Sequence, residues 1–262
     1  MKDRKLHIDN LPRVQQALLV AVALVAALFI GSILYLLFAI PNHWLTPEPR
    51  NIYERNIIAA QNAVVDAKRQ FGTGVTDDGR TPYVDAQAQL ILVRLEAGQI
   101  ERAHKNAEKL FGQHPENPYV IYAYAQALFS FEQYVDAGKV VSGLLDQVAT
   151  LPPDLQRSVY QLQAQLYLRS ERIDDAITML MKAAAVPPAS IEHYMQAGDL
   201  AVTGAMWEKA AQAYASALAY NPTSHDIQSA LSIIRTGNSE AFAEGVRAAS
   251  SDTGINVEEL LR

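Results

Sequence analysis

The longest apolar segment of the chain runs from Ala17 to Ile40 and holds no charged residue in 24 positions. As a helix rising about 1.5 Å per residue it would reach about 36 Å, enough to cross a hydrocarbon core of about 30 Å with some tilt. Pro41 follows it, and His43 and Trp44 suit the interfacial layer. The segment is longer than the apolar region of a cleaved signal peptide and lacks its small-residue cleavage site. We therefore predict a retained transmembrane helix over 17–40.

The charges on either side of this segment predict its orientation. Four basic residues precede it and only two lie close behind it: Lys2, Arg4, Lys5 and Arg13, then Arg50 and Arg55. Basic flanks normally stay in the cytoplasm. No second apolar run has a comparable length, so we expect a single-pass protein of the cell membrane, with residues 1–16 as a cytoplasmic tail and the remainder outside the cytoplasm. The opposite topology would require the basic flank to be misleading.

Behind the apolar segment, hydrophobic residues recur at helical spacing. Pro49 to Phe71 reads as one juxtamembrane helix, with these apolar positions: Ile52, Ile57, Ile58, Val64 and Val65. Residues 71–82 interrupt the pattern with three glycines and the adjacent acids Asp77 and Asp78, which predicts a loop. We assign residues 41–83 to this juxtamembrane helix and loop.

From residue 84 onward, one pattern of small and bulky residues repeats at a nearly fixed offset. The residues of the last clear unit are Tyr194, Gly198, Ala210, Tyr214 and Pro222, and 34 positions earlier stand Tyr160, Ala164, Ala176, Leu180 and Pro188. A step of 39 leads back to Ile121, Ala125, Ala137 and Val141, and another of 34 to Gln87, Ile91, Ala103 and Ala107. A recurring period of this length predicts stacked structural units. The units are 84–117, 118–156, 157–190 and 191–222.

These units resemble the tetratricopeptide repeat, a helix-turn-helix of 34 residues with the pattern W-x2-L-G-x2-Y, A-x3-F and P. The third and fourth units match it well, whereas the first departs most, with Ile91 at a small position and Arg94 at an aromatic one. The resemblance implies an all-α fold: the transmembrane helix, then an α-solenoid of about four repeats over 84–222 and a capping helix pair within 223–262. We expect Gly198 to face Ala210 where the helices of the fourth unit approach, and Gly98 to form the turn inside the first unit.

The resemblance also implies a binding groove on the first helix of each unit. Projected onto this register, the groove residues form an aromatic group, an amide row and a few others: Tyr119, Tyr122, Gln126, Phe129, Gln161, Gln165, Arg169, Met195 and Asp199. The aromatic residues would anchor a ligand and the amides would bond an extended backbone. The alternative is that the aromatic residues pack between repeats. Because Arg169 is the one cation in this projected set, beside acids such as Asp199, a carboxylate clamp in the groove is disfavoured.

Composition excludes several classes of chemistry. The chain has 262 residues and a net charge of −6, and without the first 16 residues it retains 18 basic against 26 acidic ones. This balance disfavours nucleic acid as a partner. The chain has no cysteine, and its six histidines show no metal-ligand spacing. The spaced glycines of 71–82 lack a following Gly-Lys-Ser/Thr. We therefore expect no enzyme, metal, cofactor or small-molecule substrate.

Together these patterns predict a membrane-anchored adaptor or scaffold. Its helical groove would bind other envelope proteins or peptide segments, for assembly or chaperoning of exported proteins or complexes. The alternative is a permanent structural subunit of a membrane complex, with fixed partners along both the anchor and the repeats.

Overall fold

The structure is a computed structural model that describes residues 51–76 and 81–261. The predicted cytoplasmic tail and the transmembrane helix over 17–40 lie outside the described residues. The chain divides into two compact units, Met1–Glu54 and Arg55–Arg262. Within the described ranges every regular element is a helix, and none of these helices is long and apolar enough to span a membrane.

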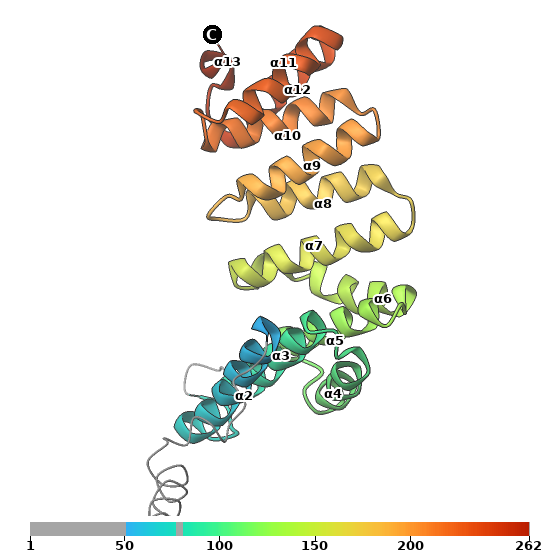
Figure 1. The fold of residues 1–262 in the computed structure, drawn as a ribbon, viewed down its shortest axis with the longest axis vertical. Helices are drawn as coiled ribbons and strands as arrows, with labels where there is room; N and C mark the ends of the chain where they lie inside the picture. The colour runs from blue at the N-terminus through green and yellow to red at the C-terminus, as the bar shows by residue number, and fades with distance from the viewer. Residues whose placement is uncertain (1–50, 77–80, 262) are drawn as a thin grey trace, which may run out of the picture. The chain divides into compact units, whose positions relative to one another are not determined.

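The described helices follow one another as neighbouring, mostly antiparallel pairs (Figure 1). Their bounds are α2 Ile52–Phe71, α3 Pro82–Glu96, α4 Ile100–Gln113, α5 Pro118–Ser130, α6 Tyr134–Leu145, the 3-10 turn η3 Val148–Thr150, α7 Pro153–Arg169, α8 Ile173–Ala185, α9 Ile191–Thr203, α10 Trp207–Tyr220, α11 His225–Gly237, α12 Ser239–Thr253 and α13 Val257–Leu260. From α3 on, each α-helix packs against the next one in the chain. The prediction of an all-α solenoid of helical repeats is confirmed.

The same turn joins the two helices of each predicted unit. Gly98, Glu132, Glu171 and Ala205 each have a left-handed backbone, with φ of 73°, 64°, 57° and 55°. At each turn the next residue's N–H donates to the carbonyl five positions back, as Gln99 N does to Arg94 O at 2.9 Å, which is a Schellman cap. These four positions are 34, 39 and 34 residues apart, the same offsets as in the sequence pattern. Only the first unit places glycine, the residue with least strain, at this position.

The buried side chains form three clusters along the helices. The first joins α3, α4 and α5, the second joins α5, α6 and α7, and the third runs from α8 to α13. The extra residues between the second and third units form η3, and Leu151 behind it is buried in the second cluster. The insertion therefore carries an apolar side chain back into the core.

Two glycines mark places where elements approach closely. A Cβ on Gly198 would stand 2.7 Å from a ring carbon of Tyr214, so this glycine makes room for the tyrosine ring. The expectation that Gly198 faces Ala210 is corrected on this point: the nearest atoms belong to a large ring. On α12, a Cβ at Gly245 would lie 2.5 Å from the Glu208 carbonyl oxygen of α10. Glycine at 245 allows these two backbones to meet.

The ends of the described chain differ in how well they are packed. No residue of α2 is buried; Ile57 and Val64 are half-buried, whereas Ile52, Ile58 and Val65 are exposed. At the other end α11 and α12 pack on α10, and the short α13 buries Val257. The C-terminal helices thus cover the last repeat.

Candidate protein-binding groove

Helices α7 and α9 lie on either side of a groove of about 440 Å³. Its polar side chains are Gln161, Gln165, Gln196, Asp199 and Thr203, and its apolar ones are Ala164, Leu168, Leu180 and Leu200. On each helix the lining residues recur three or four positions apart, so they share one face. We call this surface the α7–α9 groove.

Three residues predicted for the binding surface meet in the α7–α9 groove, namely Gln161, Gln165 and Asp199. Met195 does not line it and instead packs, partly buried, against the core cluster of α8 to α13. The projection missed Gln196, Leu200 and Thr203, because the face of α9 that lines the groove is turned by one residue from the projected one. The spacing of exposed polar residues at 196, 199 and 203 was the available signal.

A hydrogen bond from the helix behind it orients the carboxylate of Asp199. The Tyr214 hydroxyl of α10 donates to Asp199 Oδ1 at 2.5 Å, and the ring reaches this position across Gly198. Burial, and then the bond and charge of Asp199, raise the pKa of Tyr214 well above its usual value. The hydroxyl therefore stays protonated and holds one carboxylate oxygen, leaving the other for a ligand.

Polar contacts from α7 to α9 fix one end of the groove. The Gln161 side chain bonds Nε2 of the buried His193, whose Nδ1 is 2.6 Å from the Ser190 hydroxyl. Burial lowers the pKa of His193. The charge of Glu192 acts to raise this pKa, and the charge of Arg157 acts to lower it. Arg157 also donates to the carbonyls of Val186 and Pro188, at 2.8 and 2.7 Å. These bonds set the distance between the two helices that line the groove.

The predicted aromatic residues lie on α5, outside the α7–α9 groove. Tyr119, Tyr122 and Phe129 are half-buried and pack against the cluster of α5, α6 and α7. Burial raises the pKa of Tyr122, whereas a hydrogen bond with Ser158 of α7 acts in the other direction. Their packing is the alternative that the sequence left open, and a role of these residues in binding stays a prediction.

Arg169 and Gln126, the other two predicted residues, flank these aromatic side chains. The Arg169 guanidinium lies 5.9 Å from the ring centre of Phe129 and 5.4 Å from that of Tyr134. The two rings meet edge to face at 5.3 Å, so the cation covers an aromatic pair. Gln126 is half-buried one turn before Phe129. The predicted site is thus divided between an aromatic cluster and the α7–α9 groove.

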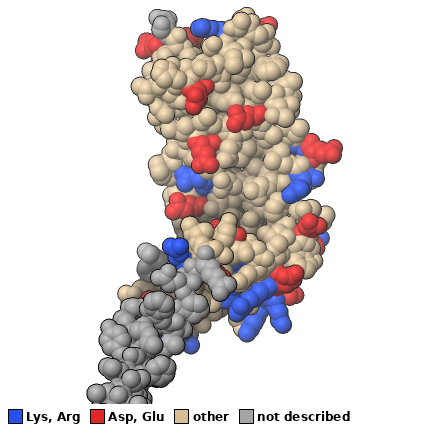
Figure 2. Space-filling view, in the orientation of Figure 1, with Lys and Arg blue, Asp and Glu red and all other residues tan. Residues whose placement is uncertain are grey.

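Charged side chains are sparse over the middle of the repeats, on the face that Figure 2 shows, and basic ones gather where Figure 1 places α4. In the described ranges no three His, Cys, Asp or Glu residues are grouped so as to hold a metal ion. The α7–α9 groove therefore offers amide donors and acceptors, one carboxylate and an apolar floor. Such a surface can bond a peptide backbone and bury an apolar side chain.

The fold defines a class of protein, an α-solenoid of helix-turn-helix repeats, and the groove lies between the first helices of two units. The model of the tetratricopeptide repeat family matches residues 94–157. This region is thus assigned to the tetratricopeptide repeat family, whose repeats mediate interactions between proteins.

Solved structures that are similar to this chain have low sequence identity to it. BtubC from P. vanneervenii is 16% identical, with a TM-score of 0.52 over 80% of this chain and 91% of that one. YrrB, described as a TPR protein with an unusual peptide-binding site, is 15% identical, with a TM-score of 0.45 over 73% of this chain and 93% of that one. A tetratricopeptide repeat protein from Parabacteroides merdae is 13% identical, with a TM-score of 0.44 over 79% of this chain and 92% of that one. No curated protein matches by sequence.

Proposed function

We propose that this protein is a membrane-anchored scaffold that binds extended segments of other envelope proteins in the α7–α9 groove. The observation that carries this proposal is the composition of the groove lining: Gln165 of α7 and Gln196 and Asp199 of α9 share it with the apolar Leu168 and Leu200. Amide side chains can both donate to and accept from a peptide backbone. Apolar residues between them provide the area that the hydrophobic effect requires.

The ligand we expect is neutral or basic, with at least one apolar side chain. Asp199 contributes the one formal charge of the groove lining, and it is negative. An acidic segment would meet repulsion there, whereas a backbone amide, or a Lys or Arg side chain, would be attracted.

Site-specific photo-crosslinking in cells would test the groove. A photoreactive residue at the exposed Gln165 should capture partner proteins, identified by mass spectrometry. The matched control is Lys182 on α8, which is also exposed and does not line the groove. Capture at both positions alike, or at neither, would contradict binding in the α7–α9 groove.

The pattern of captured species would also separate the scaffold from a permanent structural subunit. The subunit alternative is favoured by α2, which exposes Ile58 and Val65, at 46% and 54%, and buries none of its residues. Exposed apolar side chains on one helix suit a fixed interface. Several substoichiometric proteins captured at Gln165 would support the scaffold, whereas one stoichiometric protein that survives detergent extraction would support the subunit.

The membrane anchor and its orientation form a separate part of the proposal, supported by the uncharged segment 17–40 and its basic flank. The chain has no cysteine, so single cysteines can report their own location. We expect a membrane-impermeant maleimide to label Lys182→Cys in intact cells and Asn10→Cys only after the membrane is opened. Labelling in the reverse order would contradict the topology, and recovery of the protein without membranes would contradict the anchor.

A further inference from the structure

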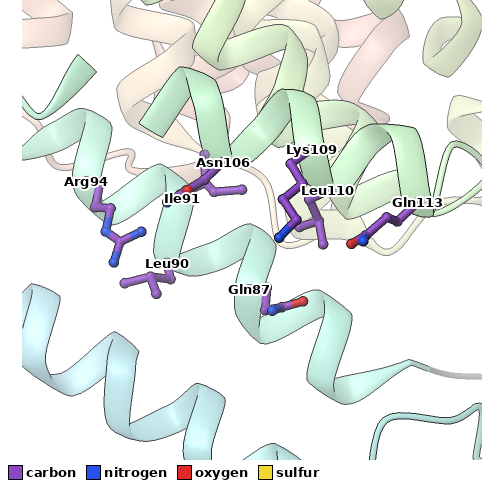
Figure 3. A pocket seen from close by; sticks show the side chains of 8 residues that line it. All are labelled: Gln87, Leu90, Ile91, Arg94, Asn106, Lys109, Leu110 and Gln113. Atoms are coloured by element: carbon purple, nitrogen blue, oxygen red, sulfur yellow. The ribbon is translucent and has the colours of Figure 1, made fainter. Parts of the chain in front are cut away.

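A second recessed surface lies on the first unit, between α3 and α4, with a volume of about 220 Å³ (Figure 3). From α3 it is lined by Gln87, Leu90, Ile91 and Arg94. From α4 it is lined by Asn106, Lys109, Leu110 and Gln113. We call it the α3–α4 pocket; none of the residues of the α7–α9 groove belongs to it.

The α3 side of this pocket occupies positions that later units use for packing. Arg94 corresponds, by the offsets of the repeat, to Leu128, Tyr167 and Ala201, which are uncharged. In the fourth unit, Ala201 lies in the same core cluster as Ile177 of the preceding α8. Before α3 the structure describes only α2, which has no buried residue. Within the described residues, α2 therefore does not bury this face of the first unit in the way that α8 buries the corresponding face of the fourth.

A polar end face is ordinary for a terminal repeat, but Arg94 is not an ordinary surface residue. Only 7% of it is exposed, and its buried Nε has no hydrogen-bond partner among the described residues. Burial, with the nearby Arg102 cation second, lowers the pKa of Arg94. A buried guanidinium nitrogen without an acceptor is costly, so packing alone does not explain an arginine at this position.

The groups around Arg94 all favour an anion. Lys109 adds a second positive charge, and Figure 3 shows its side chain extending from α4 toward Gln87 on α3, while Arg94 lies at the other end of the pocket. Asn106 and Gln113 add amide donors, and no acidic residue lines the pocket. A guanidinium matches a carboxylate with two parallel hydrogen bonds.

We propose that the α3–α4 pocket binds a carboxylate of a partner protein, next to an apolar side chain of the same segment. The apolar contact would be made by Leu90, Ile91 and Leu110, which line the same pocket. The ligand differs in charge from that of the α7–α9 groove, where Asp199 repels an acid. One chain would thus hold two segments of opposite charge preference at two separate surfaces.

Isothermal titration calorimetry of the full-length protein with short peptides tests whether the ligand is a carboxylate. N-acetyl-Leu-Leu with a free terminal carboxylate and N-acetyl-Leu-Glu-amide distinguish a terminal from a side-chain carboxylate, and N-acetyl-Leu-Leu-amide is the neutral control. At least one acidic peptide should bind more tightly than the neutral one. Equal binding of all three, or tighter binding of the neutral peptide, would overturn the proposal, as would inorganic phosphate competing better than either acid.

Matched variants test the residues. Arg94→Met should reduce the affinity for the acidic peptide by about tenfold or more, the usual effect of losing a charged hydrogen bond. Lys109→Gln, at an exposed position, should reduce it by about threefold. Arg247→Met removes the same charge at an exposed position on α12, outside the pocket lining, and should leave it nearly unchanged. An equal loss in all three variants would indicate attraction by the net charge alone and would overturn the pocket.

The stability of the peptide-free protein provides a second test that does not depend on the ligand. If Arg94 serves binding, Arg94→Met should raise the midpoint of thermal unfolding, because an apolar side chain of similar length replaces one whose buried Nε has no described partner. If Arg94→Met lowers the midpoint while Arg247→Met leaves it at the wild-type value, Arg94 supports the fold, and its role as a binding residue is overturned.

Discussion

The contact between α12 and α10 leads to a sharp prediction about one glycine. An alanine Cβ at position 245 would stand 2.5 Å from the Glu208 carbonyl oxygen, 2.6 Å from Cβ of Ala211 and 2.7 Å from the backbone nitrogen of Gln212. Carbon atoms in contact normally lie about 3.5–4.0 Å apart. Two of the three neighbours are backbone atoms of a helix, so no side chain can rotate away. Helix α12 must therefore retreat by about 1 Å.

The magnitude follows from two opposing effects. Overpacking a well-filled interface costs about 1–3 kcal/mol, whereas replacing glycine by alanine inside a helix contributes up to about 1 kcal/mol. We expect Gly245→Ala to lower the free energy of unfolding by about 1–2 kcal/mol. Gly138→Ala is the matched control, because a Cβ there meets nothing within 4 Å. It should raise stability by about 0.5–1 kcal/mol.

Urea unfolding of the full-length chain, followed by far-ultraviolet circular dichroism, measures both variants against the wild type. The two substitutions are chemically identical and should shift the midpoint in opposite directions. If Gly245→Ala unfolds at the wild-type midpoint or above while Gly138→Ala gains stability, α10 and α12 do not approach as closely as described. The close packing assigned to Gly245 would then be wrong.

Three further predictions concern turns and buried titratable groups. Glu171→Gly should raise the free energy of unfolding by about 1 kcal/mol, because glycine relieves the strain of a φ of 57°. Glu171→Ala keeps a Cβ and should not raise it. Urea unfolding of both variants measures the difference. Burial first, and then Tyr220 and Asp252, raise the pKa of Tyr194 to about 12, so the unfolding free energy should fall as pH rises from about 10 to 12. In Tyr194→Phe that part of the fall should vanish, and an unchanged slope would refute the assignment. Because burial lowers the pKa of His193, its neutral form is favoured by folding, and stability should fall as pH drops below about 6.5. In thermal unfolding at several pH values, His193→Gln should reduce this fall and His225→Gln, at an exposed position, should not.

Sequence patterns revealed the helical repeats because the features that carry them are local. A turn needs one residue with positive φ and two backbone hydrogen bonds, so it recurs at Gly98, Glu132 and Glu171 although the residue type changes. Small residues such as Ala164 and Ala176 are buried where the helices of a unit meet. Both features recur with the period of the repeat, so the spacing of residues along the sequence reveals them.

The lining of the α7–α9 groove was harder to predict because it depends on how each helix is rotated against its neighbours. The projection correctly placed Gln161, Gln165 and Asp199 in the groove lining. Their polar side chains favour a position outside the apolar core. The projection did not include Gln196, because the face of α9 that lines the groove is turned by one residue from the projected face. The helix rotation is set by contacts such as the Tyr214 ring over Gly198, which the spacing of small residues does not specify.

The sequence by itself determined the repeat period, the glycine turn of the first unit, the absence of cysteine chemistry and the expectation of a membrane anchor, because each depends on residue type and spacing alone. Only the tertiary structure decided which side chains remain available. It placed Tyr119, Tyr122 and Phe129 against the core and opened the α7–α9 groove. It also left the guanidinium of Arg94 buried without a described partner for its Nε. Burial and hydrogen bonding result from the packing of several helices, so no single stretch of the chain contains them.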